Sequence, residues 1–166
     1  FDGYNYIYMS QMFYECNSLN NVDISYFSAN NETVLEYLFF SSDNVKYLNL
    51  SNFNVKNATS LYNLMSECSS LISVDLFNFS AENDVIMDYM FFNCKNLISF
   101  NISNFNSKNG TYMNYMFGEC ISLTSVDLSN FNAHNSTNMN YMFYHCDSLN
   151  SVNLSKFTAQ NFTSLY

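Results

Sequence analysis

The sequence predicts a solenoid of α/β repeats in which one unit of 26 residues recurs along the whole chain. Two residue types keep this period without a miss. A phenylalanine occurs at Phe1, Phe27, Phe53, Phe79, Phe105, Phe131 and Phe157. An asparagine occurs at Asn5, Asn31, Asn57, Asn83, Asn109, Asn135 and Asn161. Because no insertion or deletion breaks the register, we expect residues 1–166 to form a single solenoid of about six units.

A short strand is the first element predicted in each unit. In the fifth unit, Val126 and Leu128 alternate with Ser125 and Asp127. An apolar residue at every second position is typical of a strand with one buried face. Since the equivalent strands recur in every unit, we expect them to lie in parallel along one face of the solenoid.

A short helix is the second element predicted in each unit. Met139, Met142, Phe143 and Cys146 stand at i, i+3, i+4 and i+7, which is the apolar stripe of an amphipathic helix. A threonine precedes most of these segments, where its hydroxyl could cap the helix N-terminus. These threonines are Thr33, Thr59, Thr111, Thr137 and Thr163. Val85 replaces threonine in the third segment, so we expect either a less regular start there or a cap from Asp84.

Composition and charge exclude several classes of protein. The net charge is −9, and the chain has 5 lysines and no arginine, so no basic stripe is available for nucleic acid or for an anionic membrane surface. No apolar run reaches the ~18 residues needed to cross a bilayer. With no proline and 3 glycines, the chain must turn its corners largely with asparagine, which tolerates left-handed backbone angles.

The repeat resembles a known family. The spacing of Leu123, Val126 and Leu128 resembles the LxxLxL pattern of leucine-rich repeats. The fuller unit, "CISLTSVDLSNFNAHNSTNMNYMF", resembles the BspA-like leucine-rich repeats of bacterial surface lipoproteins and some protist surface proteins. The resemblance covers every unit, and it implies a curved, right-handed solenoid with a strand-lined inner face. It also implies a surface-exposed protein without enzymatic activity that is used in adhesion or host contact. Phe131 departs from the general pattern, which has asparagine at this position.

Methionine and cysteine on the predicted helices have two possible interpretations. Residues such as Met113, Met116 and Cys120 are ligand types that suit copper(I) or zinc. However, they stand at helix-burial spacing with phenylalanine and recur in every unit, which favours packing. We therefore predict no metal and no cofactor. Adjacent helices would hold their cysteines about 8–10 Å apart, beyond the reach of a disulfide, so we predict free buried thiols.

One strand position alternates strictly between aspartate and asparagine. This strand-face column consists of Asp23, Asn49, Asp75, Asn101, Asp127 and Asn153. The alternation keeps like charges off neighbouring strands and lets each carboxylate accept hydrogen bonds from adjacent amides. Calcium is the functional alternative, but it needs several oxygens converging on one point, which a column of spaced carboxylates does not offer.

Two rows of aromatic residues fall outside the predicted core stripe. They are Tyr37, Tyr89, Tyr115 and Tyr141 in one position, and Tyr14, Phe40, Phe92 and Tyr144 in another. A contiguous exposed aromatic patch is typical of binding surfaces. Packing between neighbouring helices would explain the rows equally well, so both interpretations stay open.

Glycosylation sequons of the N-x-S/T type occur at the repeated corner. These corner sequons begin at Asn31, Asn57, Asn109, Asn135 and Asn161, and others begin at Asn49, Asn78, Asn101 and Asn153. In a secreted eukaryotic protein several would carry glycans, whereas a bacterial source would leave them bare. The repeat itself generates most of them, so their number is not independent evidence.

No catalytic arrangement is recognisable, since His134 and His145 occupy different positions of the repeat. The leading hypothesis is a non-enzymatic module, at the cell surface or outside the cell, that binds a protein or glycan of another cell or matrix. Either the strand face or the aromatic rows would bind. The alternative is a structural protein whose copies stack end to end into a fibre or surface layer, because neither end resembles a polar cap. We expect this chain to be part of a longer one.

Overall fold

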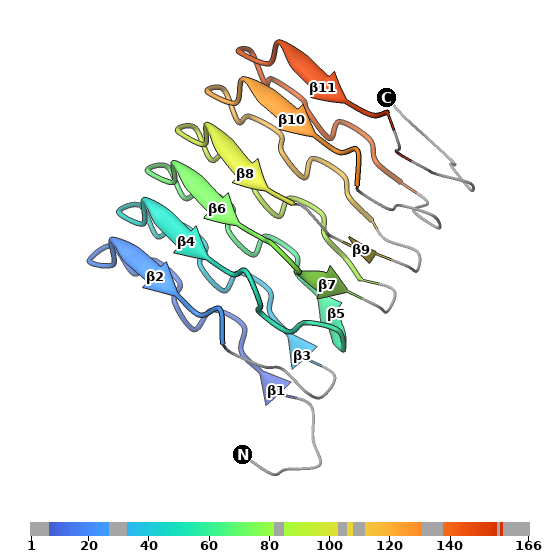
Figure 1. The fold of residues 1–166 in the computed structure, drawn as a ribbon. Coiled ribbons are helices and arrows are strands. Elements are labelled where there is room, and N and C mark those ends of the chain that lie inside the picture. The colour runs from blue at the N-terminus through green and yellow to red at the C-terminus, as the bar shows by residue number, and fades with distance from the viewer. Residues whose placement is uncertain are drawn as a thin grey trace.

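The chain folds as a parallel β-solenoid whose rungs follow the 26-residue period of the sequence (Figure 1). The computed structural model describes residues 7–26, 33–81, 85–102, 106–107, 112–130, 138–155 and 157. We number a rung from the cysteine position, so that one rung runs from Cys68 to Asn93 and the next from Cys94 to Glu119.

A row of parallel strands, which we call the main sheet, covers one face of the solenoid. Four of its strands are hydrogen-bonded in the order β2 (Asn21–Asp23), β4 (Tyr47–Asn49), β6 (Ser73–Asp75) and β8 (Ser99–Asn101). The row continues with the paired strands β10 (Ser125–Asp127) and β11 (Ser151–Asn153). Residues one repeat apart are register partners, as Val22 is of Leu48. The predicted strand of each unit is therefore confirmed in this row.

A second set of short strands forms another side of the solenoid. Its sheet is β1 (Ile7–Tyr8), β3 (Thr33–Val34) and β5 (Ala58–Ser60), and β7 (Ser80–Ala81) pairs separately with β9 (Asn106–Ser107). Successive parallel bridges join Ser60 to Ile86, Ile86 to Tyr112 and Tyr112 to Asn138, and they extend the first of these sheets. The apolar spacing of the sequence does not predict this second set.

The prediction of one helix per unit is wrong, because no helix occurs in the part of the chain that the structure describes. Consecutive β-turns replace it. The N–H groups of Met116, Gly118 and Cys120 donate to carbonyls three residues earlier. We call these turn segments the turn ladder. It consists of residues 10–15, 36–41, 62–67, 88–93, 114–119 and 140–145.

In the turn-ladder segments from residues 10–15 to residues 114–119, every second N–H donates to the next rung. The N–H of Tyr115 donates to the carbonyl of Asn140 at 3.0 Å, and that of Phe117 to the carbonyl of Met142 at 2.9 Å. Tyr115 reaches this arrangement with a positive φ of 52°. In an α-helix these N–H groups would bond within the rung. Strands of the main sheet lie about 4.8 Å apart, whereas a helix with its side chains is about 10 Å wide, so one helix per rung would require a strongly curved stack with the helices on its outer side.

The predicted capping threonines consequently have other positions. Thr33 lies in β3 and Thr59 in β5, where they belong to strands. Thr111, Thr137 and Thr163 lie outside the described residues. Val85 is buried, and there is no third helix for it to start.

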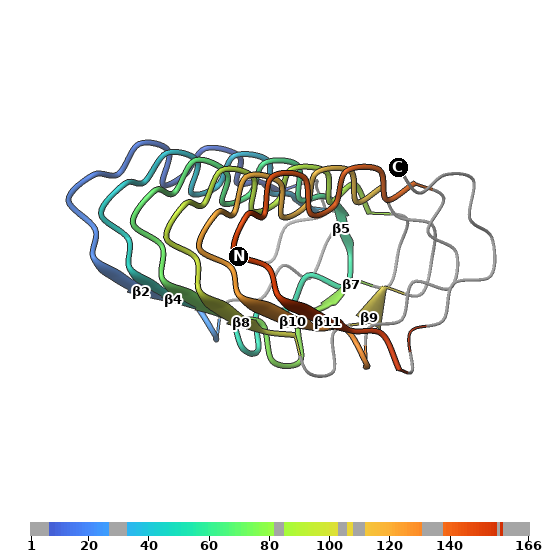
Figure 2. The same ribbon diagram turned by 90° about the horizontal axis from the view of Figure 1, so that it is seen from above.

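The core lies between the main sheet and the turn ladder, which form opposite sides of the solenoid (Figure 2). Met113, Met116, Phe117 and Cys120 are all buried in it, as the apolar spacing predicts. Phenylalanines stack from rung to rung, with ring centroids of Phe91 and Phe117 5.2 Å apart and nearly parallel. The packing interpretation of the methionine and cysteine stripe is confirmed. The right-handed winding stays a prediction.

Candidate binding surface on the main sheet

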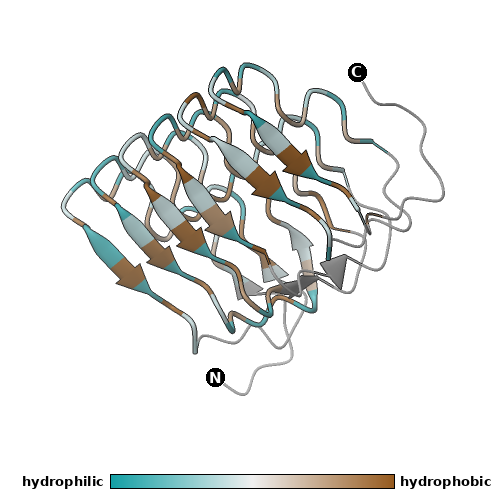
Figure 3. Cartoon of the chain, turned by 45° about the horizontal axis from the view of Figure 1, so that its top comes forward, coloured by the Kyte–Doolittle hydropathy of each residue, from teal (hydrophilic) through white to brown (hydrophobic). Residues whose placement is uncertain are grey.

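The outer face of β2, β4, β6 and β8 carries a shallow groove of about 720 Å³. Its floor follows the middle residue of each strand, whose side chain turns into the core; Leu48 and Val74, for example, are buried. The hydrophobic middle and the more polar ends of these strands are visible in Figure 3. Two side-chain columns border the groove. One is Asn21, Tyr47, Ser73 and Ser99, and the other is Asp23, Asn49, Asp75 and Asn101.

Side chains of the strand-face column are fixed by hydrogen bonds to the following turn. Asp75 Oδ1 accepts from the N–H of Phe77 at 2.9 Å and from Nδ2 of Asn101 at 3.2 Å. The first bond recurs along the column, with Asp23, Asn49, Asp127 and Asn153 accepting from the residue two positions later. The predicted bond between amide and carboxylate is thus confirmed at Asp75.

The role of this column in the turn was missed at the sequence level. Aspartate and asparagine both present Oδ1, and both favour a turn closed by the N–H two residues on. This preference was the available signal, because an aspartate or asparagine ends every main-sheet strand. The hydrogen bond from Ser25 lowers the pKa of Asp23, so its carboxylate is charged at neutral pH.

The two predicted aromatic rows pack against each other along the turn ladder. Tyr115 stacks on both neighbours, with centroid distances of 5.1 Å to Tyr89 and 4.9 Å to Tyr141. Tyr14 stacks on Phe40 at 5.3 Å. We call the whole group the aromatic ladder. It consists of Tyr14, Tyr37, Phe40, Tyr62, Tyr89, Phe92, Tyr115, Tyr141 and Tyr144.

Tyr62 belongs to the aromatic ladder but was missed in the sequence. It stands one position before the predicted row, where Asn63 takes the row's place, and contacts both Tyr37 and Tyr89 edge-to-face. Most rings of the ladder are half-buried, while Tyr14, Tyr141 and Tyr144 are about two-fifths exposed. The stacking favours packing over binding as the main role of these rings.

Gly118 makes room for the aromatic ladder. A Cβ at this position would lie 3.0 Å from Cδ2 of Phe92 and 3.3 Å from Cδ1 of Tyr115. Phe92 and Tyr144 occupy the equivalent position in the two adjacent rungs, so the small residue lies between two aromatic ones.

Free thiols are confirmed at all five cysteines, of which Cys68, Cys94 and Cys120 are buried. The helix spacing used to predict them does not apply. Instead, Sγ of Cys68 donates to the Phe39 carbonyl at 2.9 Å, and Cys94 and Cys120 make the equivalent bond. Burial raises the pKa of Cys68 to about 12. In the one rung that lacks the cysteine, Ser42 Oγ donates to the Phe13 carbonyl at 2.6 Å.

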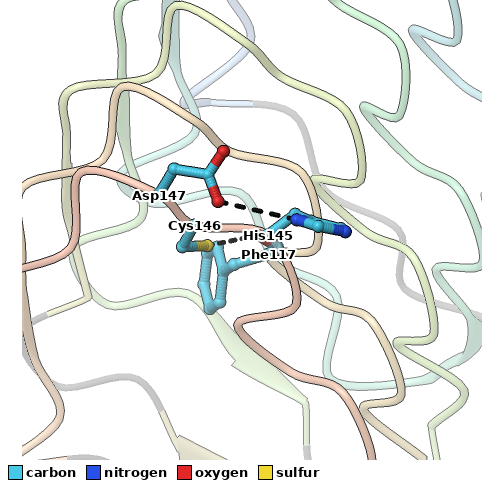
Figure 4. A network of polar contacts seen from close by, with 4 residues as sticks. All are labelled: Phe117, His145, Cys146 and Asp147. Atoms are coloured by element: carbon cyan, nitrogen blue, oxygen red, sulfur yellow. Dashed lines mark hydrogen bonds and ion pairs between the residues drawn. The ribbon is translucent and has the colours of Figure 1, made fainter.

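Figure 4 shows the polar contacts around His145. Its Nδ1 lies 3.5 Å from Oδ1 of Asp147, and both side chains are well exposed. The adjacent Cys146 thiol donates to the Phe117 carbonyl at 3.0 Å, and burial raises its pKa to about 11. Within the described ranges, no three His, Cys, Asp or Glu side chains form a group that could hold a metal ion. His134 lies outside these ranges.

A second polar column runs along the turn ladder. Asp88 Oδ1 accepts from the backbone N–H of Asn114 at 2.7 Å and from its Nδ2 at 3.0 Å, while burial raises the pKa of Asp88. Asn114 Oδ1 in turn accepts from the Asn140 N–H at 3.1 Å. These bonds join successive rungs, so the column has a structural role in holding the rungs together.

Of the corner sequons, Asn57 is exposed at a turn before β5. Asn31, Asn109, Asn135 and Asn161 lie outside the described residues. Glycosylation stays a prediction. As for membranes, the described residues contain no helix long and apolar enough to cross one.

Strands in register at every repeat, with a groove along the main sheet bordered mostly by polar side chains, define a β-solenoid repeat protein. The chain belongs to the DUF285 family, described as "Mycoplasma protein of unknown function". The family's sequence model matches residues 1–98 and again residues 74–166, so the two matches together span the chain. No curated protein matches the chain, and no solved structure does either. The resemblance to BspA-like leucine-rich repeats stays a prediction.

Proposed function

We propose that this chain is a non-enzymatic binding module that is displayed at the cell surface or outside the cell and attaches to a protein partner. The groove on the main sheet is the site we propose. The observation that carries the proposal is the repeated polar face of β2, β4, β6 and β8, which borders a groove of about 720 Å³. The adhesive role follows from the resemblance to BspA-like surface proteins.

The main sheet is favoured over the aromatic ladder because more of the side chains along its groove are exposed. Tyr47 is 51% exposed on the groove wall, whereas Tyr115 is half-buried between two stacked rings. Rings that bury each other across rungs stabilise the solenoid, and recruiting them for a partner would disturb that packing.

Preorganisation supports the same choice. The carboxylates of Asp23 and Asp75 are held by backbone N–H groups at 2.9 Å before any partner arrives. A partner that binds fixed side chains loses less conformational entropy than one that must order them. A register-locked parallel sheet therefore presents its polar groups at constant intervals.

Surface plasmon resonance with the whole chain over a panel of immobilised extracellular-matrix and cell-surface proteins tests the proposal. We expect binding to at least one protein, and loss of that binding when Ser73→Trp and Ser99→Trp fill the groove. Ser18→Trp with Ser148→Trp is the matched control, since both serines are exposed outside the main sheet. Binding that survives the groove variant would exclude this face.

A glycan array run in parallel separates the partner classes, because binding there alone would replace the protein partner by a glycan. The fibre predicted as the alternative function stays a prediction. Sedimentation velocity of the same preparation tests it, since a monomer and an end-to-end filament have very different sedimentation coefficients.

A further inference from the structure

We propose that the groove on the main sheet binds an extended basic peptide of polyproline II form with a lysine or arginine at every third residue. This inference rests on the proposed function and names the chemistry of its partner. It follows from the charge pattern, the strand spacing and the one aromatic side chain of the outer groove wall.

Negative charge on the main sheet recurs at every second rung. Asp23, Asp75 and Asp127 end β2, β6 and β10, whereas asparagine ends the strands between them. The lysines follow the opposite alternation, because all five fall in the other rungs. They are Lys46, Lys56, Lys95, Lys108 and Lys156. The charge repeat of the strand-face column is therefore two rungs long, although the structural repeat is one.

The sign of the charge selects a cationic partner. The whole chain carries a net charge of −9, and the three carboxylates stand along the groove and its continuation on β10. Lys46 directly precedes β4, between the rungs of Asp23 and Asp75. It disfavours a cation above β4 and so reinforces the two-rung interval.

The interval selects the conformation of the partner. Parallel strands lie about 4.8 Å apart, so carboxylates two strands apart are separated by about 9.6 Å. A polyproline II helix rises about 3.1 Å per residue with three residues per turn, so every third side chain points the same way at about 9.3 Å. A β-strand presents same-face side chains about 6.6 Å apart and would lose register after one step. The polyproline II form matches the column over all three aspartates.

Groove shape and composition agree with this partner. Proline-rich chains in this conformation dock into grooves lined by aromatic side chains. Tyr47 is 51% exposed on the groove wall, between the rungs of Asp23 and Asp75. The backbone bond to Oδ1 orients each carboxylate without exhausting its accepting capacity, because a carboxylate has about four lone-pair sites. A cation could thus bind while the turn stays closed.

Two peptides of one composition test the spacing on the unmodified chain. The first is Lys-Pro-Pro repeated four times, and the second has four lysines followed by eight prolines. Fluorescence anisotropy at low ionic strength is expected to show at least about tenfold tighter binding of the first peptide, and weakening of that binding with added salt. Equal affinity for both peptides would overturn the inference, since only total charge would then matter.

A matched pair of protein variants tests the site. Asp23→Asn, Asp75→Asn and Asp127→Asn together keep the Oδ1 that closes each turn, as Asn49 does naturally at 3.0 Å. We expect this variant to bind the spaced peptide about tenfold more weakly. The control, Glu15→Gln, Glu67→Gln and Glu119→Gln, removes the same charge from the turn ladder and is expected to bind as the unmodified chain does. Equal losses in both variants would contradict a site on the main sheet.

The groove-filling variant separates this inference from the function on which it rests. If Ser73→Trp with Ser99→Trp abolishes binding of a matrix protein while neither peptide binds, the groove is a binding site for another chemistry. In that case the proposed function stands and the basic peptide is excluded.

Discussion

Single side chains along the turn ladder are matched to their neighbours in the next rung, and Gly118 is the clearest case. We predict that Gly118→Ala lowers the free energy of unfolding by about 1–3 kcal/mol, because the new Cβ would lie 3.0 Å from the Phe92 ring. Urea denaturation measures the change. Combined with Phe92→Leu, which removes the ring, the alanine should cost much less. Additive losses in the double variant would contradict this contact.

Tyr115 is predicted to stabilise the solenoid. Tyr115→Ser removes two ring contacts, at 5.1 Å and 4.9 Å, and should lower the free energy of unfolding by about 2 kcal/mol. Tyr26→Ser is the control, because Tyr26 is 93% exposed and should lose almost nothing. Thermal unfolding of both variants checks the difference. Unchanged stability together with lost partner binding would return Tyr115 to the binding surface.

Cys68 is predicted to make stability depend on alkaline pH. Burial raises its pKa from 9.0 to about 12, so the folded chain keeps the proton that the unfolded chain loses above pH 9. The unfolded state then binds fewer protons, and the free energy of unfolding should fall between pH 9 and about 12. Cys68→Ser should weaken this dependence, since Ser42 occupies the equivalent position in another rung. Denaturation series at several pH values measure it.

Alkylation checks the same thiols by a separate route. Iodoacetamide is expected to label Cys68, Cys94 and Cys120 only after denaturation, because the thiolate is the reactive form and all three are buried. Labelling of these cysteines in the folded chain would contradict the burial. A mass 2 Da lower per cysteine pair would instead reveal disulfides.

The strands could be predicted from the sequence, but the turn ladder could not. Alternation of Val126 and Leu128 with polar residues has one simple interpretation, which is a half-buried strand. The spacing of Met113, Met116, Phe117 and Cys120 has two interpretations. A helix would explain it, and so does a run of β-turns, in which an N–H donates to the carbonyl three residues earlier and side chains also return to the same face. What decides between them is the neighbouring rung, which accepts every second N–H, and a single unit does not contain that information.

The same reasoning explains which part of the site was predictable. The strand-face column was identified because Asp75 and Asn101 share one position of the repeat. Tyr62 was missed because its ring enters the aromatic ladder from the neighbouring position, a shift that depends on rung-to-rung contacts with Tyr37 and Tyr89. The period of the sequence therefore shows which residues share a position of the repeat. Which side chains touch depends on how neighbouring rungs stack.

A pair of substitutions distinguishes the turn ladder from a helix. His145 is exposed and has a positive φ of 51°, which favours glycine. We predict that His145→Gly is more stable than His145→Ala by about 1 kcal/mol. In a helix the order would be reversed by a similar amount. Urea denaturation decides, and the same two substitutions at exposed Lys95, which has no positive φ, should show no advantage for glycine.

We predict that the solenoid still folds after loss of a complete rung, but that this loss disrupts the charge pattern of the main sheet. Deleting residues 94–119 joins two equivalent positions and keeps the register of the core. It also places the strands of Asp75 and Asp127 next to each other, about 4.8 Å apart, where two carboxylates repel. We expect a folded but weakened chain, because the two-rung alternation is broken while the one-rung repeat is kept.

Asp127→Asn in the same deletion variant isolates the charge effect. It restores an asparagine beside Asp75 and should raise the free energy of unfolding by up to about 1 kcal/mol at neutral pH. In the full chain, where Asn101 already lies between the two aspartates, the same substitution should change little. The gain should shrink at high salt, since screening weakens the repulsion. A gain of equal size in both backgrounds would show that the alternation does not serve to separate like charges.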